Sequence, residues 1–415
     1  MKFLANNYKK IQNTTNEQLF SYSPGICMGN DNRIIVTAGA SGNNDVLESY
    51  NVKCKRYGNY TQGRVYVSDD EGETFLKVHE FPFMHMRPFK CDNTLYILGH
   101  CSDLMIIYSK DNGDTWSKPY KLTNNQNWHQ APCNVWYENE NIYLVMERRV
   151  AKNTVGWDVN NIAPILMRAN IHSDLTNVNN WTFSSELSFN KVINKKLLNY
   201  FGIPFFWSPK KTYVEISPNR YMANIGWLET NVVKIRDKGH YLYNENTYHL
   251  FMRAHTGMTN LGCILKVVEK SDGTMETMVE TVPSGKKLVY IPIPGGQMKF
   301  HIIYDESTKL YWLLSTQSTD SMTKAELLSK ERYNLPDNER NRLVLYFSKN
   351  CFDWCFAGIV TKGESEIMSR HYAAMIINRN DLYVVSRSGD KHAKSAHNGN
   401  FISFHKIKDF RKLVY

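Results

Sequence analysis

The segment of residues 369–375 places a tyrosine beside two groups that can bind anions or move protons. It contains Arg370, His371 and Tyr372, and Arg387 and Asp390 follow fifteen and eighteen positions after the tyrosine. A phenol has a pKa of about 10 and is a poor nucleophile unless a carboxylate takes its proton. Chemistry at Tyr372 therefore requires a carboxylate from elsewhere in the chain.

Two glutamates can supply that carboxylate. Glu229 stands in the otherwise apolar, strand-like run 226–231, and an acid in such a place usually serves a purpose. Glu147 precedes Arg148, with which it can pair instead. We prefer Glu229 as the base, and we expect an acid such as Asp390 or Asp158 to protonate a leaving group.

The chain also offers many cationic and polar groups for an acidic ligand. Arginine matches a carboxylate with two parallel hydrogen bonds, and five histidines fall at comparable places in the strand pattern. No histidine spacing of the HExxH kind occurs, so we expect neither a catalytic metal nor a cofactor. The candidate substrate-binding residues are Arg87, His129, Arg148, Arg253, His255, Gln297, Lys299, His301, Arg370, His371, Arg387 and His397.

The elements that must position these residues are strands. Short runs rich in Val, Ile, Tyr and Phe alternate with polar turns, as in 33–38, 64–67, 104–108 and 343–347. They form six groups of four, beginning near residues 20, 86, 129, 205, 292 and 371. The turn between the first and second strands of a group falls at 92–93, 138–141, 219–220 and 378–381. This repeat predicts an all-β, six-bladed β-propeller of four-stranded antiparallel blades, with residues 1–415 as one domain.

Two octapeptides share a turn motif of the form Ser-x-Asp-x-Gly-x-Thr-aromatic. They span Ser68–Phe75 and Ser109–Trp116, so they lie one blade apart. The Ser and Asp side chains can bind nearby backbone amides and hold a tight turn, and glycine accepts a positive φ. The final aromatic residue is expected to pack between neighbouring sheets.

With these two turns, known as Asp-boxes or BNR repeats, the chain resembles the sialidase (neuraminidase) superfamily, whose propellers have six blades. Degenerate copies at 348–354 and 179–181 extend the resemblance over nearly the whole chain. The motif predicts fold and not activity, because it is a folding device that lies far from catalysis.

The resemblance implies roles for several residues. In sialidases a tyrosine at the start of the last blade is the nucleophile, and Tyr372 lies in the matching position. Three arginines clamp the substrate carboxylate in that family, and Arg253 can match the second of them. The first is missing, because residues 22–26 read Tyr-Ser-Pro-Gly-Ile, and the third place has Lys299 and His301. Arg87, Arg148, Arg370 and Arg387 are further cations that could substitute.

Three functions remain open on this basis. The first is an exo-acting glycoside hydrolase of the sialidase type that removes a terminal, acidic, sialic-acid-like sugar from a glycan. The second is a propeller polysaccharide lyase acting on a uronate, in which His371 or His397 works with Tyr372. The third is a glycan-binding propeller without catalysis.

Composition and charge indicate which classes of binding partner and which cellular location to expect. The net charge is +10, but the lysines and arginines are scattered, so we expect a glycan or small sugar as partner and no nucleic acid. The first residues lack a signal-peptide core, and no run is long and apolar enough to span a membrane. We therefore expect a cytoplasmic protein, with secretion after removal of a leader as the alternative. The eight cysteines form no CxxC pair, and Cys351 and Cys355 are expected to be free thiols.

Overall fold

The computed structural model describes residues 2–56, 58–151, 158–193, 200–201, 214–217, 220–222, 225–321, 323, 327–328 and 338–415. Nearly all regular structure in these residues is β-strand. The α-helices are α1 (Asn44–Glu48) and α2 (Phe189–Val192), each less than two turns long. No helix in the described ranges is both long and apolar enough to cross a membrane.

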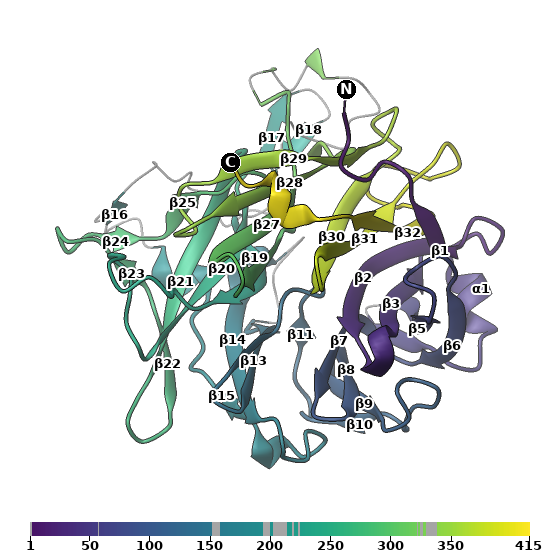
Figure 1. The fold of residues 1–415 in the computed structure, drawn as a ribbon, viewed down its shortest axis with the longest axis horizontal. Coiled ribbons are helices and arrows are strands. Elements are labelled where there is room, and N and C mark those ends of the chain that lie inside the picture. Colours follow the sequence, from purple (N-terminus) through teal and green to yellow (C-terminus); the bar gives the residue numbers. More distant parts are fainter. Residues whose placement is uncertain are drawn as a thin grey trace.

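Six antiparallel sheets of four or five strands follow one another around a common centre (Figure 1). They form the predicted six-bladed propeller. Blade 1 comprises β2 (Phe20–Met28), β3 (Ile34–Ser41), β4 (Cys54–Arg56), β5 (Asn59–Ser68) and β6 (Leu76–Phe81). Blade 2 comprises β7 (Met84–Cys91), β8 (Thr94–Cys101), β9 (Asp103–Ser109) and β10 (Tyr120–Lys121). Blade 3 comprises β11 (Trp128–His129), β12 (Trp136–Glu138), β13 (Asn141–Arg149), β14 (Ile162–Asn170) and β15 (Thr182–Phe183).

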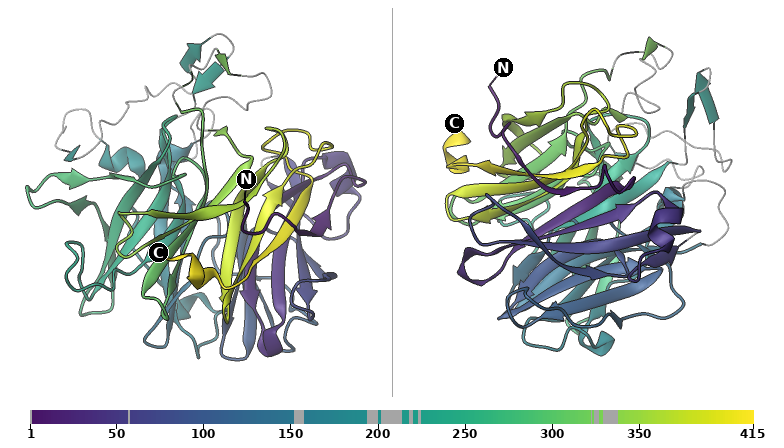
Figure 2. Two further views of the ribbon diagram at one scale, coloured as in Figure 1. Left: turned by 45° about the horizontal axis from the view of Figure 1, so that its top comes forward. Right: turned by 90° about the vertical axis from the view of Figure 1, so that its right-hand side faces the viewer.

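Blades 4 to 6 complete the circle, and their long strands run side by side with those of neighbouring blades (Figure 2). Blade 4 comprises β19 (Gly226–Val233), β20 (Thr247–His255), β21 (Leu261–Glu269), β22 (Met275–Met278) and β25 (Tyr290–Pro292). Blade 5 comprises β26 (His301–Asp305), β27 (Leu310–Thr316), β28 (Arg342–Ser348) and β29 (Cys355–Lys362). Blade 6 comprises β30 (Arg370–Asn378), β31 (Asp381–Ser388), β32 (Phe401–Ile407) and β1 (Lys9–Asn13).

The predicted start of blade 4 near residue 205 lies outside the described residues, and the first strand of that blade in the described part is β19, from Gly226. Blade 5 begins at His301 and not near residue 292. Of the predicted turn at 219–220, residue 219 also lies outside the described residues; β17 (Val214–Ser217) and β18 (Arg220–Met222) pair with each other in a small sheet outside the blades. Short strands at β16 (Tyr200–Phe201), β23 (Glu280–Thr281) and β24 (Lys287–Leu288) form another small sheet outside the blades. These insertions carry strand-like sequence, which shifted the predicted boundaries.

The N-terminal strand closes the propeller. β1 pairs with β32, so the outermost strand of blade 6 comes from the start of the chain (Figure 1). Closure of this kind removes a free sheet edge, which an open circle of blades would expose. The sequence repeat did not predict it, because the partner strands lie almost 400 residues apart.

The first strands of blades 1, 2, 4 and 6 contain the same irregularity. In each, two residues of the first strand stand opposite one residue of the second strand, which is a β-bulge. The bulges in blades 2, 4 and 6 give His85, Glu229 and Tyr372 positive φ angles of 55°, 62° and 50°. Side chains of this size rarely adopt such angles, and the strain often marks a functional site.

A side chain from the preceding blade holds each of these three bulges. Thr37 Oγ1 donates to the Met86 carbonyl in blade 2 at 2.7 Å. Gln130 Nε2 donates to the Thr230 carbonyl in blade 4 at 2.8 Å, and the Lys299 ammonium donates to the Ala373 carbonyl in blade 6. The strained residues are therefore fixed by contacts between blades and not by their own strands.

The two octapeptide turns have the geometry that their residues predict. Asp70 accepts from the backbone N–H and the hydroxyl of Thr74, and Asp111 does the same with Thr115. The first turn lies between β5 and β6, and the second lies between β9 and β10. Phe75 packs against Phe404 at a ring distance of 5.3 Å, so the first turn joins blade 1 to blade 6.

Most of the apolar core lies in layers between neighbouring blades. One cluster joins blades 1 and 2, a second joins blades 2 and 3, a third spans blades 3 to 5, and two more join blade 6 to blades 5 and 1. Burial of this apolar surface is the main stabilising contribution to folding. The blades therefore depend on one another for stability.

A disulfide between Cys54 and Cys101 links blade 1 to blade 2. The remaining cysteines are free thiols, which agrees with the expectation for Cys351 and Cys355. The cysteine spacing did not predict this bond, because its partners are 47 residues apart. Disulfides persist mainly in oxidising compartments, and the location of the protein stays a prediction.

We predict that Gly113→Ala lowers the free energy of unfolding by about 1–2 kcal/mol, because its φ of +96° is unfavourable for any residue with a Cβ. An added Cβ would also lie 3.0 Å from Ile35 Cδ1. Chemical denaturation measures the change. Gly239→Ala is the control, since this glycine has no positive φ. An equal effect of both substitutions would contradict the role of the turn.

Candidate active site

A continuous ring of polar side chains surrounds one end of the central channel. Its members come mainly from the first strands of the blades. Four ring-to-ring contacts and one carboxylate contact run from Tyr372 through His397, Tyr22, His85 and His129 to Glu147, and electrostatic interactions of Glu229 with Glu147 and Tyr372 close the ring. Three members, His85, Glu229 and Tyr372, are the strained residues of the bulges.

Tyr372, Glu229 and Arg253 form the centre of the site. Arg253 Nη1 donates to the Tyr372 hydroxyl oxygen at 3.2 Å and to Glu229 Oε2 at 3.3 Å. This shared donor brings the Glu229 carboxylate near the phenol, where its charge acts on Tyr372. Arg253 Nε is bound to the Gln297 carbonyl at 2.7 Å, which fixes the guanidinium. The phenol thus has a carboxylate next to it to accept its proton.

Burial decides the protonation states of this pair. It raises the pKa of Glu229 above the ordinary 4.5, and the nearby Glu147 raises it further, while Arg253 lowers it. Burial and the charge of Glu229 raise the pKa of Tyr372 above 10. At neutral pH the phenol therefore keeps its proton at rest, and Glu229 is a stronger base than an exposed carboxylate.

Three arginines lie around Tyr372, from blades 4, 5 and 6. Arg253 touches the phenol, and the charges of Arg340 and Arg387 also act on it. Arg387 lies over the Tyr22 ring with its guanidinium carbon 3.9 Å from the ring centre. A cation from blade 6 thus lies against a tyrosine of blade 1.

Arg340 and Arg387 are held by histidines. Arg340 Nη1 is 3.1 Å from His371 Nδ1, and Arg387 Nη2 is 3.3 Å from His397 Nδ1 and also donates to its carbonyl. Both arginines are almost completely buried. His371 and His397 therefore orient the cations beside Tyr372.

Glu147 is a second buried carboxylate next to Glu229. His129 Nδ1 lies 2.9 Å from one of its oxygens, and the hydroxyl and backbone N–H of Thr230 donate to the other at 2.8 and 3.1 Å. Burial raises the pKa of Glu147 to about 7. These bonds make Glu147 a support for the bulge that carries Glu229.

Arg87, Lys299 and His301 lie deeper in the channel than the ring. Arg87 and His301 line a cavity of about 350 Å³ inside the channel, whose other walls are mostly apolar. Lys299 is bound to the Ala373 carbonyl, and burial lowers its pKa to about 8. Gln297 accepts from the Asn260 N–H. The structure brings these candidates close to the site, as its floor and supports.

Three candidates lie away from the ring. Asp390 pairs with Lys10 at the outer edge of blade 6, and its bonds hold its pKa at about 2, so it stays ionised. Arg370 stacks over Tyr8 and Phe401, and Arg148 pairs with Glu186. The structure therefore does not place Asp390 as an acid.

Two further candidates lie beside the site and not in its ring. Asp158 lies 3.6 Å from Arg149. His255 is two residues beyond Arg253 on the same face of β20, further towards the rim.

Sequence reasoning missed His85, Arg340 and the supporting role of Tyr22. His85 stands one residue before the expected start of blade 2, and Arg340 follows an insertion whose boundaries were uncertain. A comparison of the blade openings would have aligned His85 with Tyr372. Within the described ranges, no group of three or more His, Cys, Asp or Glu side chains is arranged to hold a metal ion.

We predict that Glu147→Gln changes how stability depends on pH. A buried carboxyl with a pKa near 7 binds its proton more tightly in the folded state, so wild-type stability falls as the pH rises from about 4.5 to 7. The variant lacks this ionisation, so its stability relative to the wild type should rise between pH 5 and pH 8. Urea unfolding at both pH values measures the difference. A constant difference would show that Glu147 does not titrate in this range.

No protein-family model matches the sequence. No curated protein matches it either.

Solved structures match over almost the whole chain. An α-L-arabinanase of Penicillium chrysogenum in complex with arabinobiose is 9% identical, with 98% of this chain and 99% of that chain covered and a TM-score of 0.51. A Trypanosoma rangeli sialidase in complex with sialic acid is 12% identical, at 95% and 55% coverage and a TM-score of 0.52. A Hadza microbial sialidase is 11% identical, at 97% and 68% coverage and a TM-score of 0.55. The chain thus spans about half of the Trypanosoma enzyme. The chain therefore shares its fold, a six-bladed β-propeller, with these enzymes.

Proposed function

We propose that this protein is an exo-acting glycoside hydrolase of the sialidase type, which cleaves a terminal acidic sugar from a glycan. The observation that carries the proposal is that Arg253 Nη1 donates to both the Tyr372 hydroxyl and Glu229, which brings the phenol and the carboxylate together. The fold agrees with it, because the similar solved structures include sialidases and an arabinanase. In this reading the partner is a glycan or a small sugar.

The arrangement supports a two-step reaction. The Tyr372 oxygen attacks the anomeric carbon while its proton passes to Glu229, and the bond to the leaving oxygen breaks, with its electron pair staying on that oxygen, which takes a proton from solvent. Water then attacks the anomeric carbon, the bond to the Tyr372 oxygen breaks, Glu229 returns its proton to the phenol oxygen, and the surplus proton of the water passes to solvent. A neutral phenol suits attack on an anionic sugar, because it brings no extra negative charge to the centre.

The three arginines support an acidic substrate. Arg253, Arg340 and Arg387 put three positive charges around Tyr372 in a nearly water-free setting, where charge pairing is strong. A sugar carboxylate at this place would compensate them. The proposal therefore assigns Arg253, Arg340 and Arg387 to the anionic group of the substrate.

Two alternative functions give different products. A lyase acting on a uronate creates a C=C bond that absorbs ultraviolet light, while a hydrolase does not. A binding propeller would retain the sugar unchanged. Incubation with a panel of fluorogenic glycosides, including a sialoside, and with polyuronates separates all three.

We predict that Tyr372→Phe reduces kcat on the best fluorogenic glycoside by at least about a thousandfold, since it removes the attacking atom. The KM should change much less. Circular dichroism and thermal unfolding check that the variant folds. If Tyr372→Phe kept full activity, Tyr372 would not be the nucleophile, and a mechanism through the Glu229 and Glu147 carboxylates would replace the proposed one.

We predict that the acid limb of the kcat/KM profile lies above pH 4.5, since the pKa of Glu229 is raised and the base must be ionised. Arg253→Met should move this limb to higher pH, because Arg253 lowers the pKa of Glu229. Arg148→Met is the control, since Arg148 pairs with Glu186 away from the ring, and its limb should not move. A limb that stays in place in Arg253→Met would exclude Glu229 as the titrating base.

A further inference from the structure

His85 occupies the same structural position as the two central residues of the site, yet the proposed reaction gives it no role. It is the first residue of the blade-2 bulge, as Glu229 and Tyr372 are in blades 4 and 6, and its φ of 55° is as unfavourable as theirs. Thr37 of the preceding blade holds this bulge. A strained backbone position that a neighbouring blade stabilises often belongs to a functional residue.

A hydrogen-bonded chain fixes which nitrogen of His85 carries the proton. Arg56 Nη1 lies 3.1 Å from His100 Nδ1, and His100 Nε2 lies 3.0 Å from His85 Nδ1. Arginine can only donate, so His100 Nδ1 must accept and the His100 proton is on Nε2. That proton is donated to His85 Nδ1. The His85 proton is consequently on Nε2.

The described residues leave the Nε2–H of His85 unused. No hydrogen bond to this nitrogen occurs in the part of the chain that the structure describes, and His85 is partly exposed, whereas His100 and His129 are buried. The ring lies 5.3 Å from His129 and 6.5 Å from Tyr22, on which Arg387 stacks. Burial and the charges of His129, Arg56, Arg387 and Arg149 hold the pKa of His85 well below 6.5, so the ring is neutral. It therefore offers one fixed donor.

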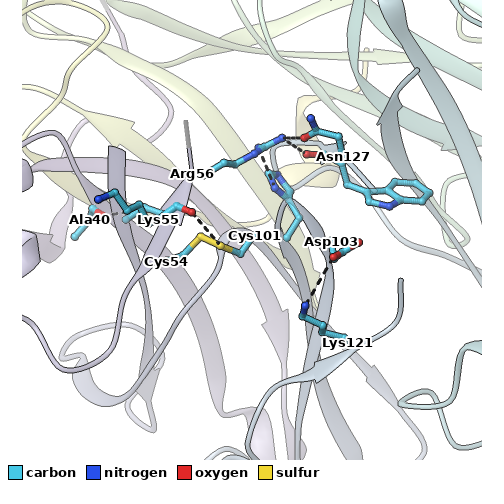
Figure 3. Close-up of a disulfide and its surroundings, with 11 residues drawn as sticks. Ala40, Cys54, Lys55, Arg56, Cys101, Asp103, Lys121 and Asn127 are labelled. Atoms are coloured by element: carbon cyan, nitrogen blue, oxygen red, sulfur yellow. Dashed lines mark hydrogen bonds and ion pairs between the residues drawn. A yellow bond between two sulfur atoms is a disulfide. The ribbon is translucent and has the colours of Figure 1, made fainter. Parts of the chain in front are cut away.

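The disulfide holds the start of this chain of bonds (Figure 3). Cys54 is two residues before Arg56 in β4, and Cys101 directly follows His100 in β8. The disulfide therefore links the two strands that supply Arg56 and His100. Arg56 Nη2 also donates to Asn127 Oδ1 and to the Trp128 carbonyl in blade 3, at 2.8 and 2.6 Å. β4 is only three residues long and pairs with β5, so the disulfide is the covalent bond that holds it to blade 2.

We propose that His85 is a specificity-determining residue that donates its Nε2–H to an acceptor oxygen of the sugar substrate, and that Arg56, His100 and the Cys54–Cys101 disulfide position this donor. The proposal rests on the proposed function, because it places the substrate between His85 and Tyr372. Reduction of the disulfide then weakens substrate recognition without removing the nucleophile.

The tautomer is tested by NMR on protein labelled with ¹⁵N in the histidine rings, with His85 assigned from the His85→Gln variant. We expect His85 with its proton on Nε2 in the wild type, and a mixture of tautomers in Arg56→Met and in the Cys54→Ser/Cys101→Ser double variant. His405 is the internal control, because it is bound to Ala5 and Ser403 in blade 6 and should not change. A proton on Nδ1 of His85, or no response to Arg56→Met, would overturn the positioning chain.

The donor is tested by kinetics on the best fluorogenic glycoside. His85→Phe and the double serine variant should each lower kcat/KM by about tenfold, mainly through KM, which corresponds to one lost hydrogen bond. His85→Gln keeps an N–H donor and should recover most of the loss. Unchanged KM in His85→Phe would refute the substrate contact.

Failure of the proposed function gives a distinct result. If the wild type hydrolyses no glycoside, the proposed function and the substrate role of His85 fail together, while the NMR measurement still decides the Arg56–His100–His85 chain. Thermal unfolding of the double serine variant separates a local effect from loss of the fold. A large drop in its midpoint would assign the disulfide to stability and would contradict the positioning role.

Discussion

The structure depends on hydrogen bonds by which one blade holds the bulge of the next. Thr37, Gln130 and Lys299 each bind a backbone carbonyl in the following blade, directly after His85, Glu229 and Tyr372. A positive φ at a bulky residue costs about 1–3 kcal/mol and persists only where the surroundings impose it. The contacts between blades impose it here, so closure of the propeller and formation of the site are one event.

This constraint explains why buried polar groups gather at the channel mouth. Lys299 and Gln130 are occupied with backbone groups, and Glu147 is occupied with Thr230 and His129. Buried polar groups are costly unless they are paired, so each of them contributes to a support. Around Tyr372 lie Glu229 and three arginines, which Gln297, His371 and His397 hold in place, and an acidic sugar would complement their net positive charge.

The two halves of the ring use different chemistry. The half formed by blades 4 to 6 is cationic and contains the phenol with its carboxylate. The half formed by blades 1 to 3 contains neutral histidines, oriented by Arg56 and a disulfide. A substrate that spans the channel mouth would meet charge on one side and fixed neutral donors on the other. This division suits a sugar with one acidic group and several hydroxyls.

The sequence by itself determined the repeating strand pattern and the two octapeptide turns, because both depend on residues close together in the chain. It also pointed to Glu229, as an acid in an apolar strand, and the resemblance to sialidases pointed to Tyr372 and Arg253. Only the tertiary structure decided that Arg387 stands over Tyr22, that β1 closes blade 6, and that Asp390 is bound to Lys10 at the outer edge. Those contacts join residues tens to hundreds of positions apart. Local sequence cannot specify them, because they arise when the blades close into a circle.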